Sequence, residues 1–270
     1  MGILNATPDS FFDQGTHFSL EKGILHGLSL ASQGADILDI GGASSRPGAP
    51  QVEIEEEMRR VIPLIEALKA NISIPISIDT THVKVARMAV EKGATLINDI
   101  NGFQSPELCE FAVSCNAELC LMHRRKLQDL DRVCDPDLVI ASILHFFEHQ
   151  ISRLVSYGVK ESRIILDPGI GFGKTPDYHI AILKGFEAFK RLGFRLLVSA
   201  SRKGSMAKIL GRSPQDLLAP TLSTHAILFS KGADIFRVHD VKEHRDALDF
   251  ISHFCGEPFP LEKLVNHQEI

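Results

Sequence analysis

The chain has 270 residues, of which 44% are hydrophobic, and its formal net charge is -5 at pH 7. This length can bury one large core and is typical of α/β barrels that fold as a single domain. The acidic balance argues against a general nucleic-acid-binding protein, because non-specific affinity for nucleic acids depends on Lys and Arg that neutralise phosphates.

Eight short apolar runs, rich in strand-forming residues, alternate with longer segments of helical periodicity. They predict strands over residues 2–5, 36–40, 74–79, 95–99, 118–122, 163–167, 195–200 and 234–238. Between them, apolar residues recur at helical spacing, as at Leu20, Ile24 and Leu28, which predicts helices that pack one face against a sheet. The polar stretch 124–136 predicts an extended loop after the fifth strand.

One helix-to-strand joint recurs three times along the chain. Gly34, Gly93 and Gly232 each follow a predicted helix, precede an alanine and lead into a predicted strand. Glycine suits the left-handed conformation that often ends a helix. Alternating strands and helices indicate parallel pairing, and eight such units without a linker favour closure into a barrel. We therefore expect one (β/α)8 TIM barrel domain over residues 1–270, with little or no segment before the first strand; an open doubly wound sheet is the alternative.

Polar residues occupy nearly all the positions at which the predicted strands end. In barrels of this class the carboxyl-end loops meet at one mouth, where catalytic residues gather, so we interpret these residues as the lining of an active site. The alternative is that Asp and Asn cap the helices that follow, and for Asp39 both interpretations stay open. The strand-end residues are Asn5, Asp39, Asp79, Asn98, Met122, His123, Asp167, Ser201, Arg202, Lys203, Arg237 and His239.

The polar residues near this mouth form two sets. Asp79, Asn98 and Asp167 offer acceptors and one amide to a flat polar heterocycle. Basic residues gathered in an acidic chain predict a small phosphorylated or pyrophosphorylated substrate. This second set consists of Arg46, Lys203, Arg237 and His239.

Cysteine usage and hydropathy predict a cytoplasmic protein. The five cysteines include no C-x-x-C pair, so neither a disulfide framework nor a zinc site is expected. We find no signal peptide and no apolar run of about 18 residues, so no membrane partner is expected. Residues 145–149 (HFFEH) match a bare zinc-protease pattern, which we interpret as a chance match because no second signature accompanies it.

Four segments carry a family resemblance. Residues 1–11 (MGILNATPDSF), 39–48 (DIGGASSRPG), 167–174 (DPGIGFGK) and 201–203 (SRK) resemble the signatures of the dihydropteroate synthase family. Residues 77–80 (SIDT), 98–100 (NDI) and 237–240 (RVHD) fit the same pattern. All of them follow in family order along essentially the whole chain, and chance does not supply such a series.

The resemblance implies a transferase of folate biosynthesis that folds as a TIM barrel. Members of the family join 6-hydroxymethyl-7,8-dihydropterin pyrophosphate to p-aminobenzoate, which yields 7,8-dihydropteroate and pyrophosphate. They are also targets of sulfonamides. The resemblance further implies a cytoplasmic homodimer whose substrates are small molecules and whose cofactor is Mg²⁺.

The resemblance also implies roles for individual residues. The p-aminobenzoate pocket would include Phe11, Pro47, Lys203 and Gly204. Mg²⁺ would be held by Asn5 and Asp13, and the pyrophosphate by Ser45, Arg46, Arg237 and His239. The pterin would contact Asp79, Asn98, Met122, Asp167, Phe172 and Lys203. The residues that would act in catalysis are Asp79, Lys203, Arg237 and His239.

Ala6, Ala43, Ser45 and Gly204 depart from the family pattern. Gly204 matters most, because the family places there a serine whose hydroxyl contacts the p-aminobenzoate carboxylate; Ser205 is the neighbouring hydroxyl that could substitute. Two alternatives remain. A pterin-binding methyltransferase domain shares the barrel, but the Ser-Arg-Lys and Arg-Val-His motifs oppose it. A catalytically silent pterin-binding protein is opposed by the intact set of Asn5, Asp13, Lys203, Arg237 and His239.

Overall fold

The structure is a computed structural model that describes residues 1–7, 12–13, 17–43, 52–124 and 138–254. Within these ranges the chain forms an eight-stranded sheet in which each strand pairs in parallel with the next. Leu, Ile and Val dominate the strands, as expected for a sheet covered on both faces. The strands are β1 (Gly2–Asn5), β4 (Leu38–Gly41), β5 (Ile76–Asp79), β6 (Leu96–Asp99), β7 (Glu118–Met122), β8 (Ile164–Asp167), β9 (Arg195–Val198) and β10 (Ile235–Phe236).

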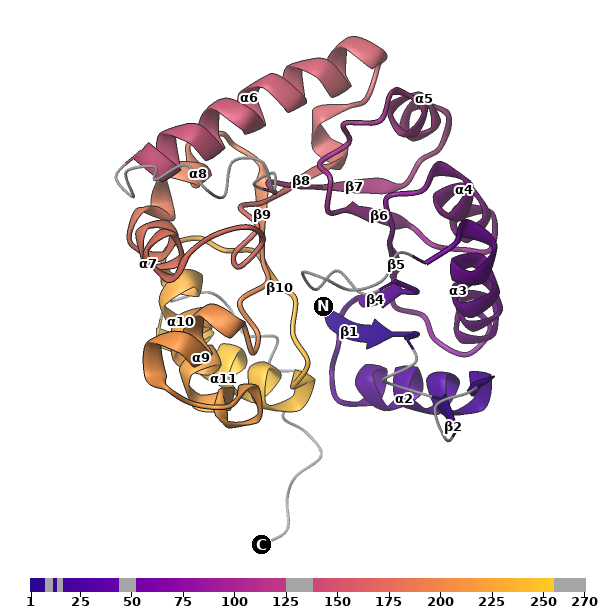
Figure 1. Ribbon diagram of the computed structural model, residues 1–270, viewed down its shortest axis with the longest axis horizontal. Coiled ribbons are helices and arrows are strands. Elements are labelled where there is room, and N and C mark those ends of the chain that lie inside the picture. Colours follow the sequence, from indigo (N-terminus) through magenta and orange to yellow (C-terminus); the bar gives the residue numbers. More distant parts are fainter. Residues whose placement is uncertain (8–11, 14–16, 44–51, 125–137, 255–270) are drawn as a thin grey trace, which may run out of the picture.

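The sheet closes on itself between its first and last strands. Gly2 and Val238 form a parallel bridge. The backbone N–H of Val238 donates to the carbonyl of Met1 at 2.9 Å, and that of Ile3 donates to the carbonyl of Val238 at 2.9 Å. Figure 1 shows the strands in the interior of the molecule with the helices around them. The predicted (β/α)8 barrel is confirmed, and the open-sheet alternative is wrong.

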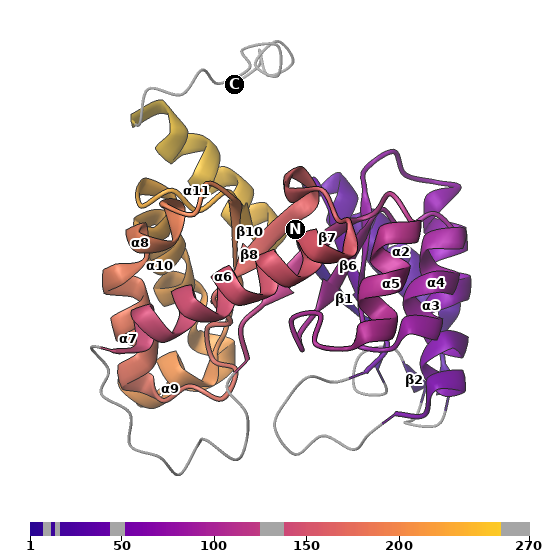
Figure 2. The same ribbon diagram turned by 90° about the horizontal axis from the view of Figure 1, so that it is seen from above.

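Helices connect consecutive strands and cover the outside of the barrel (Figures 1 and 2). The short elements α8 (Glu187–Lys190), η3 (Glu161–Arg163), η4 (Pro214–Asp216) and the pair β2 (Phe12–Asp13) and β3 (His17–Phe18) have no counterpart among the predicted elements. The longer helices are α2 (Leu20–Ser32), α3 (Ile54–Lys69), α4 (Val83–Glu91), α5 (Pro106–Ser114), α6 (Val139–Tyr157), α7 (Pro176–Gly185), α9 (Gly204–Leu210), α10 (Leu218–Ser230) and α11 (Val241–Phe254).

Side-chain alternation along the strands divides the interior into an outer and an inner region. Leu38 and Ile40 of β4 belong to the large apolar core between sheet and helices. Because successive side chains point to opposite faces of a strand, Asp39 between them points into the barrel. Inside the barrel, a smaller apolar cluster contains Met1, Leu96, Cys120, Ile165 and Leu197.

The strand boundaries lie within two residues of the predicted ones. The three repeated joints also have the expected conformation, since Gly34, Gly93 and Gly232 have φ angles of 94°, 110° and 89°. The extended loop predicted after the fifth strand falls, apart from Arg124, outside the described residues. Sequence periodicity therefore located the elements that carry the strand-end residues.

Candidate functional site

The carboxyl ends of the strands bring predicted residues together at one end of the barrel. The register of the sheet places Asn5, Asp79 and Asn98 at one level on β1, β5 and β6. Met122 and Asp167 lie side by side at the ends of β7 and β8. Residues that are far apart in the sequence therefore share one polar cluster.

Arg237, just after β10, binds carboxylates on two other strands. Its Nε donates to Asp39 Oδ2 at 2.6 Å, and its Nη2 donates to Asp79 Oδ2 at 2.8 Å. The Arg237 side chain is only 11% exposed, so both ion pairs lie where water screens them weakly. Burial alone would lower the pKa of Arg237, but Asp39 and Asp79 raise it, and the guanidinium stays charged.

Asp39 is fully buried and lies at the centre of a network of side chains. Its Oδ1 accepts from Ser77 Oγ at 2.5 Å, and the amide nitrogen of Asn98 donates to its Oδ2 at 3.3 Å. Among the described residues, no backbone N–H of a helix donates to this carboxylate, and Glu53 is the residue at the N-cap of α3. The helix-cap interpretation of Asp39 is wrong, because its partners are the side chains inside the barrel.

Asn98 presents a buried acceptor that the described residues leave unused. The Asn98 amide nitrogen faces Asp39, so its Oδ1 points elsewhere, and this buried oxygen has no partner in the described part of the chain. Asp167 Oδ1 accepts from the N–H of Gly169 at 2.7 Å. A buried acceptor without a partner is unfavourable, so this arrangement fits a ligand that carries N–H donors.

The carboxyl groups of the cluster have raised pKa values. Burial raises the pKa of Asp79 to about 7, although the charge of Arg237 opposes the shift. Burial also raises the pKa of Asp167, against the effects of the Gly169 N–H and of Lys203. Perturbed carboxyl groups beside buried cations are typical of functional sites.

Lys203 lies over an aromatic ring at the edge of the cluster. Its Nζ is 4.2 Å from the centroid of Phe172, which is a cation–π contact. Burial, and then the positive charge of Arg237, lower the pKa of Lys203 to about 8. Phe172 stands in a loop that Lys174 closes by donating to the carbonyls of Gly169 at 2.8 Å and His123 at 2.9 Å. Lys174 is the last residue of a family motif, but no role was predicted for it from the sequence.

His239 follows Arg237 by two residues and is held by Ser201. The Ser201 Oγ accepts from the backbone N–H of His239 at 3.3 Å and lies 2.9 Å from His239 Nδ1. When the Ser201 hydroxyl donates to Nδ1, the ring proton lies on Nε2, which can then donate to a ligand. Burial, and then the charge of Arg237, lower the pKa of His239. The ring is therefore neutral at pH 7 and can contact an anion as a hydrogen-bond donor but not as a cation.

Some of the remaining predicted site residues lie in the described part of the chain, and the others lie outside it. Asn5 is half-buried, and Gly204 is exposed at the start of α9, where a Cβ would have open space around it. Ser205 cannot substitute for the missing hydroxyl at Gly204, because its buried Oγ is bonded to Nδ1 of His179. The backbone of Asp13 lies in β2. Outside the described residues lie Phe11, Ser45, Arg46 and Pro47.

The weaker sequence signals form no site in the described ranges. His145, Glu148 and His149 are exposed on α6, and no group of three or more His, Cys, Asp or Glu able to hold a metal occurs among the described residues. The described thiols of Cys109, Cys115 and Cys120 are free. None of the helices in these ranges has the length and apolar character that crossing a membrane requires.

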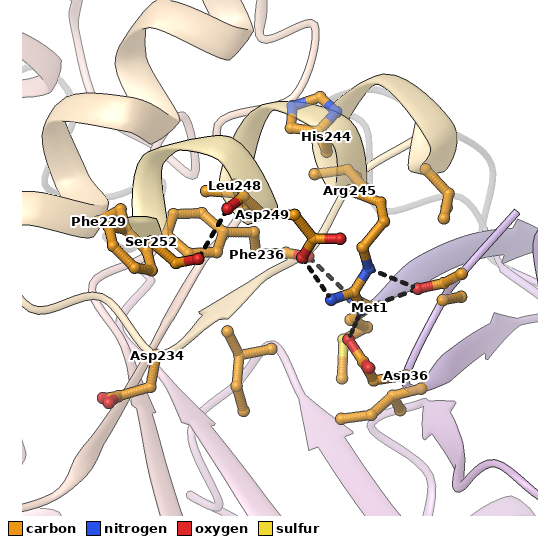
Figure 3. Close-up of a pocket in the computed structure, with 16 residues that line it drawn as sticks. Met1, Asp36, Phe229, Asp234, Phe236, His244, Arg245, Leu248, Asp249 and Ser252 are labelled. Atoms are coloured by element: carbon orange, nitrogen blue, oxygen red, sulfur yellow. Dashed lines mark hydrogen bonds and ion pairs between the residues drawn. The ribbon is translucent and has the colours of Figure 1, made fainter. Parts of the chain in front are cut away.

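A cavity of about 380 Å³ lies at the opposite end of the barrel (Figure 3). Met1 and Asp36, near the amino ends of β1 and β4, line it together with Arg245 of α11. Arg245 donates to the carbonyl of Gly34 at 2.8 Å and pairs with Asp249 at 3.3 Å. None of the predicted site residues in the described ranges lines this cavity, so it is separate from the strand-end cluster.

Comparison with known proteins shows which family the chain belongs to. A family model described as "Pterin binding enzyme" matches residues 1–239. The dihydropteroate synthase of Synechocystis sp. (strain ATCC 27184 / PCC 6803 / Kazusa) is 45% identical over 245 residues, which are 90% of this chain and 85% of that protein. The chain belongs to the dihydropteroate synthase family.

Solved dihydropteroate synthases share the fold along the whole barrel. The Xanthomonas albilineans enzyme, solved with 4-aminobenzoic acid, has a TM-score of 0.89 and 39% identity, and the match covers 95% of this chain and 93% of that one. The same enzyme in complex with 7,8-dihydropteroate has a TM-score of 0.86 and 36% identity, with the same coverage. The predicted transferase of folate biosynthesis is thereby confirmed.

Proposed function

We propose that the protein joins 6-hydroxymethyl-7,8-dihydropterin pyrophosphate to p-aminobenzoate and releases 7,8-dihydropteroate and pyrophosphate. This assignment rests on the buried oxygen of Asn98, which has no partner among the described residues. Asn98 lies at the level of Asp79, inside the same barrel end as Asp167. A dihydropterin edge carries several N–H donors, and these three side chains supply acceptors for them. Met122, at the end of β7, and Phe172, in the loop after β8, contact the ring.

A second set of residues binds the pyrophosphate. Arg237 uses Nε for Asp39 and Nη2 for Asp79, so these two bonds leave Nη1 to donate to the leaving group. His239 adds a neutral donor, and Ser45 and Arg46 complete the set.

Asn5 and Asp13 hold Mg²⁺ in this proposal. Asn5 is the last residue of β1 and is half-buried, at the level of Asp79 and Asn98 in the sheet. Amide and carboxylate oxygens are the hard ligands that Mg²⁺ prefers. When bound, the ion neutralises part of the charge on the pyrophosphate.

The reaction is a dissociative displacement. As the bond between the pterin methylene carbon and the pyrophosphate oxygen breaks, the pterin fragment gains positive charge, which the Asp79 carboxylate stabilises. The amine nitrogen of p-aminobenzoate then bonds to that carbon and releases one proton. This nitrogen is neutral and nucleophilic at pH 7, so the protein needs no activated Ser or Cys. Phe11, Pro47, Lys203 and Gly204 form the pocket for p-aminobenzoate.

One assay tests the function. The pure protein is incubated with the pterin pyrophosphate, p-aminobenzoate and Mg²⁺, and we expect dihydropteroate and pyrophosphate in equal amounts. Tight pterin binding without product would instead contradict the synthase and favour one of the two pterin-binding alternatives. For the residue roles, Asp79→Asn should impair pterin binding and catalysis, and Arg237→Ala should mainly impair pyrophosphate binding. Wild-type rates in both variants would contradict these roles.

We further propose that residues 1–270 form one domain that assembles as a homodimer in the cytoplasm. The homodimer is inferred from family membership, and the cytoplasmic location fits the free thiols. Light scattering at several protein concentrations measures the oligomeric state, and a monomer at all of them would contradict the dimer.

A further inference from the structure

Asp39 holds side chains from three other parts of the barrel. Its carboxylate accepts from Ser77 of β5, from Asn98 of β6 and from Arg237 after β10, at 2.5, 3.3 and 2.6 Å respectively. Asp39 has no exposed surface. A buried carboxylate with this many donors, one of them charged, is fixed in a single orientation.

The orientation of Arg237 depends on this carboxylate. A guanidinium group is planar, so the bond from Nε to Asp39 at 2.6 Å fixes the plane in which its two terminal nitrogens lie. In that plane Nη2 reaches Asp79 at 2.8 Å. Without Asp39, Arg237 would be free to turn toward Asp79 alone.

The orientation of Asn98 depends on it as well. An amide presents a donor on one side and an acceptor on the other, and the negative charge of Asp39 selects the donor. The Asn98 Oδ1 atom therefore faces away from Asp39, where it remains buried and unpartnered among the described residues. An uncharged residue at position 39 would no longer distinguish the two orientations of the amide.

We propose that Asp39 is a positioning residue for the pterin-binding site, where it aligns Arg237 and Asn98 and keeps Asp79 from forming an exclusive pair with Arg237. The proposal rests on the pterin-binding role of this cluster given above. Asp39 does not touch the substrate, because it is fully buried below the residues that do.

The charge of Asp39 has a second effect that can be measured. Among the described residues, the charged groups that act on Asp79 are Arg237, Asp39, Glu57, Asp99 and Lys203. Asp39 is one of the negative groups that raise the pKa of Asp79, and Arg237 lowers it. Removing the Asp39 charge therefore lowers the pKa of Asp79 for two reasons: one repulsion is lost, and Arg237 pairs with Asp79 more fully.

The test compares pterin pyrophosphate binding by wild type and Asp39→Asn from pH 5.5 to 9, with Mg²⁺ and without p-aminobenzoate. In the wild type, affinity should fall as the pH decreases below about 7 and Asp79 takes up a proton. In Asp39→Asn, affinity at pH 8 should be about tenfold weaker or more, because two binding groups lose their alignment. The acid decrease should begin about one pH unit lower. The KM for p-aminobenzoate should stay unchanged.

A control variant separates positioning from loss of stability. Ile40→Val lies next to Asp39 on β4, but its side chain belongs to the outer core. It should lower the thermal midpoint and leave the affinity and its pH profile at wild-type values. If Asp39→Asn shows only the behaviour of Ile40→Val, the proposal is wrong.

A failure of the inference about Asp39 can be told apart from a failure of the variant to fold and from a failure of the proposed function. Should Asp39→Asn fail to fold, Ser77→Ala removes one donor from the same carboxylate and should weaken pterin binding about threefold without changing the KM for p-aminobenzoate; wild-type binding by Ser77→Ala would overturn the proposal. If the wild type itself makes no dihydropteroate, the proposed function fails. If the wild type is active and Asp39→Asn binds and titrates like it, only the inference about Asp39 fails.

Discussion

Arg202 and Asp240 form an ion pair with two hydrogen bonds that joins the loop after β9 to the turn after β10. Arg202 Nε donates to Asp240 Oδ2 at 2.9 Å, and Nη2 donates to Oδ1 at 2.6 Å. The neighbours of this pair in the chain are Lys203 and His239. Within the Ser-Arg-Lys motif, Arg202 therefore holds the two loops together, while Ser201 holds the ring of His239.

Asp240→Asn should destabilise the protein by about 1–3 kcal/mol, the usual effect of losing a charge-assisted hydrogen bond that is partly buried. Asp246→Asn is the matched control on the same helix, because it removes the exposed pair with Lys242 and should change stability by about 0.5 kcal/mol or less. Urea denaturation measures both, and equal losses would contradict the role of the Arg202 pair.

Binding of the pterin pyrophosphate should weaken at alkaline pH. Because the pKa of Lys203 is lowered to about 8, the ammonium is charged below this pH and loses its proton as the pH rises through it. Affinity should therefore change little between about pH 7 and pH 8 and then decrease by up to about tenfold per pH unit above pH 8. In Lys203→Arg the charge persists, and this decrease should be absent. The same alkaline decrease in that variant would assign the titration to another group.

Two glycines with left-handed backbones provide a test of the loop that follows Asp167. Gly169 has a φ of 65°, and a Cβ there would lie 2.0 Å from the carbonyl oxygen of His123. Gly193 has a φ of 81° but has nothing within 4 Å of a Cβ. Gly193→Ala should lower stability by about 1 kcal/mol through backbone strain alone. Gly169→Ala should lower it by about 3 kcal/mol or more and also weaken pterin binding, because the clash displaces the loop. Similar losses of stability in urea would contradict the contact with His123.

Gly204→Ser should lower the KM for p-aminobenzoate. A side chain at Gly204 meets no atom within 4 Å, so the hydroxyl usual in this family can be added without a clash. Gly204→Ala is the control, because it makes the same backbone change without the hydroxyl. Both variants should gain about 0.4–1 kcal/mol in stability, but only Gly204→Ser should lower this KM, by roughly three- to tenfold. An equal change in both variants would exclude a role for the hydroxyl.

Much of the barrel was predictable because its signals are local. The apolar runs and the joints at Gly34, Gly93 and Gly232 depend on neighbouring residues, and strand ends such as Asp79 and Asn98 follow directly from them. The contacts that these strand-end side chains make with one another were not predictable. Asp39 and Arg237 are 198 residues apart, so no periodicity in one sequence relates them, and capping propensity left Asp39 with two interpretations. Ser205 shows the same limit, because only the packing of α7 against α9 shows that its hydroxyl faces His179.

The bridge between Gly2 and Val238 closes the ring of strands directly beside Arg237, which precedes Val238 in the chain. If β1 and β10 separated at this bridge, Arg237 on the β10 side would move away from Asp39 on β4 and Asp79 on β5. The proposed pterin ligand, held by β5, β6 and the residues after β10, would span the junction between β1 and β10 and stabilise it. Because such a ligand binds only the closed ring, it shifts the equilibrium between closed and open forms by mass action. In the proposed complex, the substrate would thus also stabilise the pairing of the first and last strands of the barrel.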